Sequence, residues 1–266
     1  MASPNALLDV AVAAARAAAG VIRTAAADPG SIEVRAKQPG DFVTQVDLAS
    51  EHAIVQTLLG AFPSHAVRSE ESVHAHGRPG ADHVWIVDPL DGTTNFIHGY
   101  PAYAVSIALA VSGRVEVGVV LDVMRGDIFH AVLGGGAFRN AQRLAVAQRT
   151  LLKDAVVATS CPPRAGAGFE RSMQLLGAVL QRAHALRRSG SAALDLAWVA
   201  AGQCDAQLDL GLNAWDVAAG GLLVAEAGGL VSDFNGDSAF LESRECLAAN
   251  PALHAQLHAI LAPFSK

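Results

Sequence analysis

The strongest constraint on the fold is a series of short apolar runs in the first half of the chain, each shorter than a typical helix. These runs cover residues 83–88, 103–111, 115–123 and 128–133. Gly113 and Gly126 lie between successive runs, where glycine permits the tight backbone that a turn needs. The pattern predicts β-strands, and the last three runs are expected to form an antiparallel meander.

Helical periodicity precedes these strands and dominates the second half. It predicts helices at residues 5–26, 44–62, 169–184, 191–201, 215–227 and 251–261, with further short strands at 32–34, 155–159, 206–210 and 230–233. Thr44 followed by Asp47 resembles a capping box with a shorter acid. We therefore expect an α+β part over residues 1–142 and an α/β part over residues 143–266, packed as one compact unit with any site between them.

Composition excludes several classes of protein. The 266 residues are 52% hydrophobic and 17% charged, which favours a folded core over disorder. A net charge of −6 gives no reason to expect direct nucleic-acid binding. The three cysteines form no CxxC pair, so free thiols in a reducing compartment are expected. Residues 1–27 lack the pattern of a signal peptide, and no segment is expected to span a membrane, so the expected location is cytoplasmic.

The most informative local motif runs from Asp88 through Pro89, Leu90 and Asp91 to Gly92 and Thr93. A buried strand delivers Asp88 at its end, and Pro89 keeps the residue before it extended. Asp91 is expected to return around a tight bend, so that both carboxylates face one point. Carboxylates in pairs gather hard cations, and N–H groups at a following helical turn can bind phosphate oxygens. The alternative is that Asp88 merely ends a strand and Asp91 merely caps a helix.

Other acids lie where a strand or loop meets a helix. They are Asp47, the pair Glu70-Glu71, and Asp216 after Trp215. Taken singly, each is more simply explained as a helix-start acid or a solvated loop acid. Taken together with the first motif, they favour a metal site.

These segments resemble the inositol monophosphatase family. The matching segments are residues 41–47, 70–72, 88–96, 187–195 and 215–229, which occur in order and at suitable spacing. The resemblance implies a layered αβαβα sandwich of the inositol monophosphatase/fructose-bisphosphatase type, in the α+β class. It also implies two to three Mg²⁺ ions per subunit and a homodimer.

The resemblance assigns roles by motif position. Glu70, Asp88 and the Leu90 carbonyl would hold one metal ion. Asp88, Asp91 and Asp216 would hold the second, and Glu70 would hold a third, weaker ion through water. The catalytic residues would be Thr93 and Asp47, together with Glu70, which would orient and deprotonate the attacking water.

Substrate contacts also follow from the resemblance. The N–H groups of Gly92 and Thr93 would bind the phosphate, whereas Asp91, Ala192 and Asp209 would contact hydroxyls of the alcohol. Arg187 is expected nearby. Asp209 departs from the family pattern, which has Glu at this place, and residues 159–162 depart from the family's usual Gly- and Phe-containing turn.

The function implied is Mg²⁺-dependent hydrolysis of inositol monophosphate, or of a similar small phosphate monoester, to the alcohol and inorganic phosphate. One alternative keeps this chemistry on histidinol, sugar or nucleotide phosphates. Another belongs to a different class, a partner of the transcription machinery with incidental phosphatase activity. In that case Arg187-Arg188 could mark a protein-binding surface.

Overall fold

The computed structural model describes residues 2–38, 41–72, 74–160 and 167–264. Its first half is built on an eight-stranded sheet in the order β10-β9-β8-β7-β6-β5-β3-β4. β3 and β5 pair in parallel, and the other neighbours pair antiparallel. The strands are β3 (Ala66–Ser69), β4 (His76–Gly77), β5 (His83–Asp91), β6 (Ala104–Val111), β7 (Arg114–Asp122), β8 (Ile128–Val132), β9 (Gly136–Arg139) and β10 (Gln142–Arg143).

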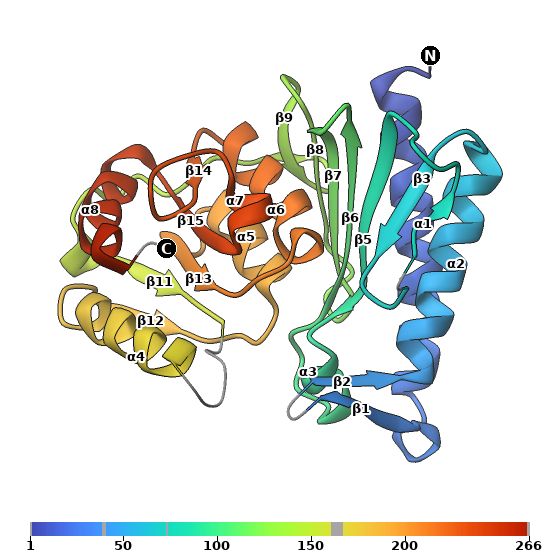
Figure 1. The fold of residues 1–266 in the computed structure, drawn as a ribbon, viewed down its shortest axis with the longest axis horizontal. Helices are drawn as coiled ribbons and strands as arrows, with labels where there is room; N and C mark the ends of the chain where they lie inside the picture. The colour runs from blue at the N-terminus through green and yellow to red at the C-terminus, as the bar shows by residue number, and fades with distance from the viewer. Residues whose placement is uncertain (1, 39–40, 73, 161–166, 265–266) are drawn as a thin grey trace.

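Two long helices, α1 (Pro4–Ala26) and α2 (Gln45–Ala61), cover the outer face of this sheet (Figure 1). By length and composition α1 could cross a membrane, contrary to the expectation for this segment. Its apolar face packs instead against α2 and the sheet, with seven buried residues: Leu7, Ala11, Ala14, Ala15, Ala18, Ala19 and Ile22. One face of α1 is therefore buried against the rest of the protein.

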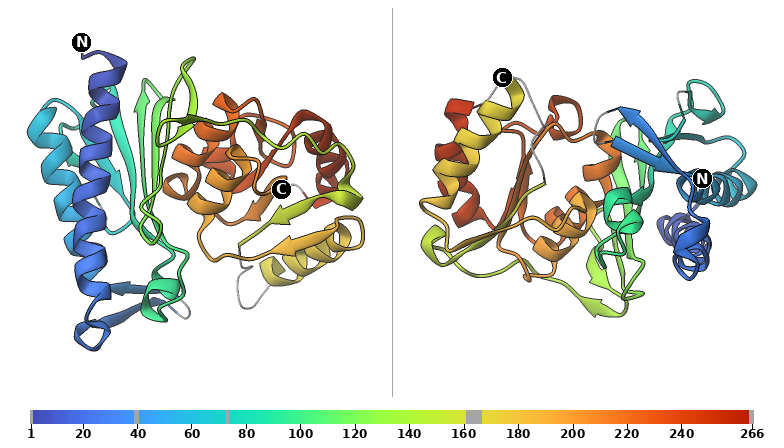
Figure 2. Two further views of the ribbon diagram at one scale, coloured as in Figure 1. Left: turned by 180° about the vertical axis from the view of Figure 1, so that it is seen from behind. Right: turned by 90° about the horizontal axis from the view of Figure 1, so that it is seen from below.

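The second half is built on a five-stranded sheet in the order β12-β11-β13-β15-β14. The strands are β11 (Val156–Ala158), β12 (Ala185–Arg187), β13 (Ala206–Leu210), β14 (Leu230–Ser232) and β15 (Glu245–Ala249). Helices α4 (Ala167–Leu180) and α8 (Pro251–Leu261) lie on its outer face, as the views in Figure 2 show. Leu175, Val179, Leu253 and Leu257 are buried in the cluster between these helices and the sheet.

Helices α5 (Ala192–Ala200) and α6 (Ala214–Glu226) lie between the two sheets, with the short α7 (Phe240–Ser243) beside α6 (Figure 1). One buried cluster joins both helices to the inner face of the first sheet. At Gly118 on β7, an added Cβ would lie 2.8 Å from the carbonyl oxygen of Ala219 on α6, so only glycine allows the two backbones to approach this closely. The layer order is helix, sheet, helix, sheet, helix, which confirms the predicted αβαβα arrangement.

The local predictions hold at most elements and fail at a few. The meander over β6, β7 and β8 is confirmed, as is the capping box, in which the Thr44 backbone N–H and hydroxyl both donate to Asp47. The strand expected at 32–34 lies instead at β1 (Val34–Gln38), which pairs with β2 (Asp41–Thr44). Cys204 and Cys246 are buried free thiols, as expected, whereas Cys161 lies outside the described residues.

Candidate active site

The candidate site forms where β5 ends between the two halves. The strand does not stop at Asp88 as predicted but continues to Asp91, with a shift of register against β6 between these two residues. The tight bend expected between Asp88 and Asp91 is instead an irregularity within the strand, and this strand presents both carboxylates. The Ser50 hydroxyl of α2 fixes this segment by donating to the Pro89 carbonyl at 2.7 Å.

Gly92 ends the strand and begins α3 (Thr93–Ile97). Its φ of +93° lies in the left-handed region that favours glycine. A Cβ there would also lie 2.9 Å from the Ala102 carbonyl oxygen. The predicted helical turn after Asp91 is thus confirmed, and the sharp change of direction explains why glycine occupies this position.

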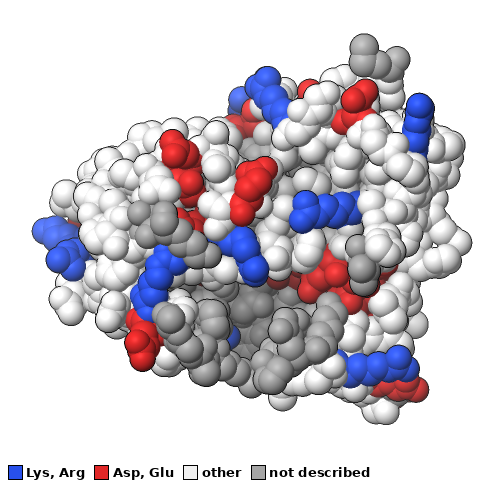
Figure 3. Space-filling view, viewed as in Figure 1, with Lys and Arg blue, Asp and Glu red and all other residues white. Residues whose placement is uncertain are grey.

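Four carboxylates form the acidic part of the site, and Figure 3 shows a group of acidic side chains close together on one face of the molecule. Burial raises the pKa of Asp88 well above its ordinary value of 3.8. Three neighbouring carboxylates raise it further: those of Glu70, Asp91 and Asp216. Because each charge opposes the others, this group needs either protons or a cation to be stable.

Local hydrogen bonds hold these carboxylates in place. Asp88 Oδ1 accepts the Leu90 N–H at 3.0 Å, and Asp216 Oδ2 accepts the Asn213 N–H at 2.7 Å at the start of α6. Burial and the charge of Asp91 raise the pKa of Asp216 well above 3.8, and the bond from Asn213 opposes that rise. These bonds position each acid but also direct some oxygens towards the backbone.

The donor set fits a hard divalent cation. All the candidate ligands are oxygens, which Mg²⁺ prefers. In the part of the chain that the structure describes, no three His, Cys, Asp or Glu side chains are already arranged as a metal-binding group. The charges of these acids influence one another over distances longer than a metal–oxygen bond. The acids therefore share one site, although their oxygens are not all within bonding distance of a single point.

Asp47 and Thr93 meet beside these acids, although 46 residues separate them in the sequence. The Thr93 hydroxyl lies 3.0 Å from Asp47 Oδ1 and 3.1 Å from the Leu90 carbonyl oxygen. The other oxygen, Asp47 Oδ2, accepts the capping bonds from Thr44. Burial raises the pKa of Asp47, and the bonds from Thr44 and Thr93 partly offset this. Because the capping box uses only Oδ2, Oδ1 of Asp47 is available to accept the Thr93 hydroxyl.

The second half contributes α5 to the site. Asp91 Oδ2 accepts the Ser191 hydroxyl at 2.5 Å and the Ala193 N–H at 2.8 Å. Burial raises the pKa of Asp91 to about 6, against the effect of these bonds. Ala192, expected near the alcohol, is the first residue of α5 and is buried. Arg187 is exposed, and its Nη1 donates to the Leu186 carbonyl at 2.9 Å.

Asp209 is held by donors from its own half. Its Oδ1 accepts the Ser160 N–H and hydroxyl at 2.5 and 2.7 Å, and also the Thr159 hydroxyl at 3.2 Å. Its Oδ2 accepts the Gln207 side-chain amide at 2.7 Å. Burial raises the pKa of Asp209 to about 6. An alcohol hydroxyl that reached this carboxylate would have to share it with these donors.

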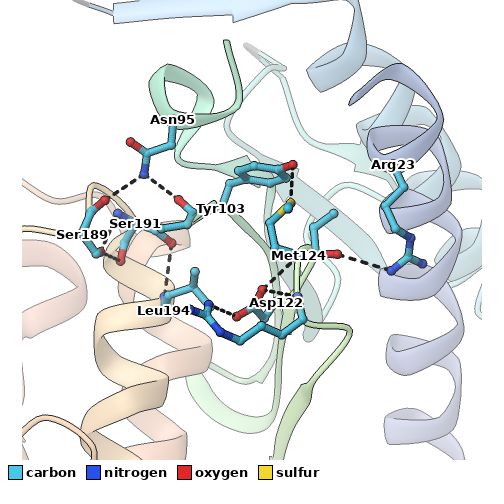
Figure 4. A network of polar contacts seen from close by, with 11 residues as sticks. Arg23, Asn95, Tyr103, Asp122, Met124, Ser189, Ser191 and Leu194 are labelled. Atoms are coloured by element: carbon cyan, nitrogen blue, oxygen red, sulfur yellow. Dashed lines mark hydrogen bonds and ion pairs between the residues drawn. The ribbon is translucent and has the colours of Figure 1, made fainter. Parts of the chain in front are cut away.

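Several residues at the site were missed from the sequence. Asn95 Nδ2 donates to the Ala102 and Ser189 carbonyl oxygens at 2.6 and 2.8 Å, which ties α3 to the turn before α5 (Figure 4). The Ser106 hydroxyl of β6 donates to the Trp215 carbonyl at 3.1 Å at the start of α6. Asn95 and Ser191 lie within the segments 88–96 and 187–195 that resemble the family, and Ser191, which follows Gly190, opens an Ala-rich helix as a serine N-cap would.

With this fold and this site, the chain belongs to the inositol monophosphatase family, which matches residues 3–264. It is similar to Nus factor SuhB of Pseudomonas aeruginosa, with 45% identity covering 92% of this chain and 91% of that protein. Among solved structures it is similar to extragenic suppressor protein suhB from Bartonella henselae, with a TM-score of 0.92 and 38% identity covering 96% and 98% of the two chains. It is also similar to inositol monophosphatase from Anabaena, with a TM-score of 0.84 and 32% identity covering 97% and 96%.

Proposed function

We propose that the chain is a Mg²⁺-dependent phosphatase that hydrolyses a small phosphate monoester, with inositol monophosphate as the leading substrate. The observation that carries this proposal is the position of the Thr93–Asp47 pair beside the group of carboxylates around Asp88. Family membership supports phosphatase chemistry, and the name of the Anabaena relative supports inositol monophosphate as the substrate.

In this proposal the chain's own oxygens hold two principal Mg²⁺ ions, with a third bound more weakly. Glu70, Asp88 and the Leu90 carbonyl would hold the first, and Asp88, Asp91 and Asp216 the second. Bound Mg²⁺ would neutralise phosphate charge and make a nearby water more acidic. Residues 1–142 then carry most ligands, and residues 143–266 complete the site with Asp216.

Thr93 and Asp47 would handle the proton of the attacking water. Asp47 Oδ1 accepts the Thr93 hydroxyl, so a lone pair on Thr93 Oγ1 is left to accept a hydrogen bond from water. The raised pKa of Asp47 makes it a better proton acceptor than an exposed aspartate. Backbone N–H groups of Gly92 and Thr93, at the start of α3, would orient the phosphate. Ala192 and Asp209 lie on the α5 and β13 side, where the alcohol would be bound.

The test is a panel of phosphate monoesters assayed with and without Mg²⁺. The panel includes inositol, histidinol, sugar and nucleotide phosphates. Asp88→Asn removes one charge from the only carboxylate assigned to both principal ions, so activity should fall by about 100-fold or more, beyond the loss typical of an outer-shell change. Asp233→Asn is the matched control, since Asp233 is also buried but accepts the N–H groups of Asn235 and Asp237 in a turn after β14. Near wild-type activity of Asp88→Asn in saturating Mg²⁺ would refute the proposal.

A second candidate function comes from the name of the Pseudomonas relative, Nus factor SuhB, which supports contacts with the transcription machinery. Arg187, exposed at the end of β12, belongs to a surface that could serve such contacts. Binding assays with purified transcription factors test this role. Asp88→Asn should still bind if the role is independent of catalysis, and loss of binding in Arg187→Ala would locate the contact.

We also propose a cytoplasmic homodimer. Buried free thiols at Cys204 and Cys246 are compatible with a reducing compartment. Tyr100 and Met124 are large apolar side chains that stay about half exposed in the single chain, at 55% and 49%. Light scattering tests the dimer, and a mass that stays near 27.4 kDa across a wide concentration range would exclude it.

A further inference from the structure

The turn that precedes α5 holds a candidate metal ligand from the opposite half of the chain. Ser191 is fully buried, and its hydroxyl donates to Asp91 Oδ2 at 2.5 Å. The Ala193 N–H reaches the same oxygen at 2.8 Å. Two donors on one oxygen fix the rotation of the carboxylate about its last bond, and so fix the direction of the other oxygen, Oδ1.

The Ser191 hydroxyl has a defined orientation because it also caps α5. Its oxygen accepts the Leu194 N–H at 3.3 Å. With that lone pair engaged by the helix, the hydroxyl proton points towards Asp91. A hydrogen bond to a charged acceptor is stronger than one between neutral groups.

The turn itself is fastened to the segment that carries Asp91. Asn95, four residues after Asp91, donates to the Ser189 carbonyl at 2.8 Å (Figure 4). Gly190 has a φ of +87°, and a Cβ there would lie 2.8 Å from the Asn95 amide nitrogen. Asp91 and Asn95 thus hydrogen-bond to the turn at two points, which limits how far Ser191 can move relative to Asp91.

We propose that Ser191 is a positioning residue that directs the second carboxylate oxygen of Asp91, Oδ1, towards the divalent cation. The inference rests on the proposed function, because Asp91 is a ligand only if the site binds Mg²⁺. Ser191 itself touches neither metal nor substrate. Partners of this kind change metal affinity by about 10- to 100-fold when they are removed.

The experiment is Mg²⁺ titration calorimetry without substrate, paired with the Mg²⁺ dependence of kcat. Ser191→Gly removes the hydroxyl but retains a residue that N-cap positions tolerate, so α5 should be little affected. We expect Mg²⁺ affinity to fall about 10- to 100-fold, whereas kcat at saturating Mg²⁺ falls much less. Ser191→Thr keeps the donor and should restore affinity to within about threefold of the wild type.

The matched control is Ser3→Gly, which removes the serine N-cap of α1, where the Ser3 hydroxyl accepts the Ala6 N–H. It should leave Mg²⁺ affinity unchanged. Equal Mg²⁺ affinity in wild type and Ser191→Gly would overturn the role of Ser191 and leave the proposed function standing. A wild-type chain that binds no Mg²⁺ would overturn both.

Discussion

Replacing Asp195 by Asn should make the stability of the protein less sensitive to alkaline pH. Asp195 lies on α5, one turn after Ser191, and its side chain has no exposed surface. Neither carboxylate oxygen has a hydrogen-bond partner among the described residues. Burial raises the pKa of Asp195 from 3.8 to about 8. The nearby Ser189 hydroxyl offsets part of this rise, although its own bond goes to the Ser191 carbonyl at 3.2 Å.

The sign follows from proton binding. Between pH 3.8 and about 8 the folded state holds a proton on Asp195 that the unfolded state releases, so stability falls as pH rises through this window. Each pH unit is worth about 1.4 kcal/mol. From pH 5 to pH 8 the wild type should therefore lose about 4 kcal/mol relative to Asp195→Asn, which carries a neutral side chain of the same shape. Above the folded pKa the two curves should run parallel again.

Urea unfolding of both proteins at several pH values from 5 to 9 measures this difference. The other titrating groups are common to both proteins and largely cancel. Asp205→Asn is the contrasting control, since Asp205 accepts Arg149 Nη1 at 3.0 Å and the Val156 N–H at 2.8 Å, and its replacement should destabilise the fold by about 1–3 kcal/mol. A difference between wild type and Asp195→Asn that stays constant from pH 5 to pH 8 would refute the reasoning.

Two further predictions concern packing and specificity. Gly118→Ala should lower the free energy of unfolding in urea by about 1–3 kcal/mol, because its Cβ would meet Ala219 of α6. Gly177→Ala, where no atom lies near the added Cβ in α4, should raise it by about 0.5–1 kcal/mol. Similar stabilities of the two variants would contradict the contact. Asp209→Glu restores the longer acid typical of the family, and should raise kcat/KM for inositol monophosphate relative to glycerol 2-phosphate. An unchanged ratio of the two kcat/KM values in steady-state assays would mean that Asp209 does not contact the alcohol.

The sequence predicted elements whose stability is local. The meander and α8 were predictable because apolar period, turn glycines and a proline at the first helical position are all short-range signals. Asp47 at the third position of α2 was predictable for the same reason, since a capping box needs only four consecutive residues. β5 was predicted too short, because proline usually ends a ladder. Here the register shift accommodates Pro89, and pairing resumes at Asp91.

Long-range contacts at the site could not be read from the sequence. Ser191 lies 100 residues from Asp91, and the Ser160–Asp209 bonds span 49 residues. No local period specifies either pairing, because both depend on how α5 and β13 are placed by packing between two sheets. The family resemblance predicted which acids form the site, but it did not predict which oxygen of each acid accepts hydrogen bonds from the protein.

These hydrogen bonds to single carboxylate oxygens link the fold to the proposed chemistry. In Asp47, one oxygen completes the cap of α2 and the other accepts Thr93; in Asp91, Oδ2 accepts donors from α5. In each carboxylate, therefore, one oxygen has a structural role. The bonds to that oxygen fix the direction in which the second oxygen points. The two acids are held by opposite halves of the chain, since α2 precedes the first sheet and α5 lies between the sheets. A relative shift of the halves would turn Asp91 without turning Asp47. For this reason we expect changes at the packing contact between β7 and α6 to weaken the proposed Mg²⁺ binding before they disturb the Thr93–Asp47 pair.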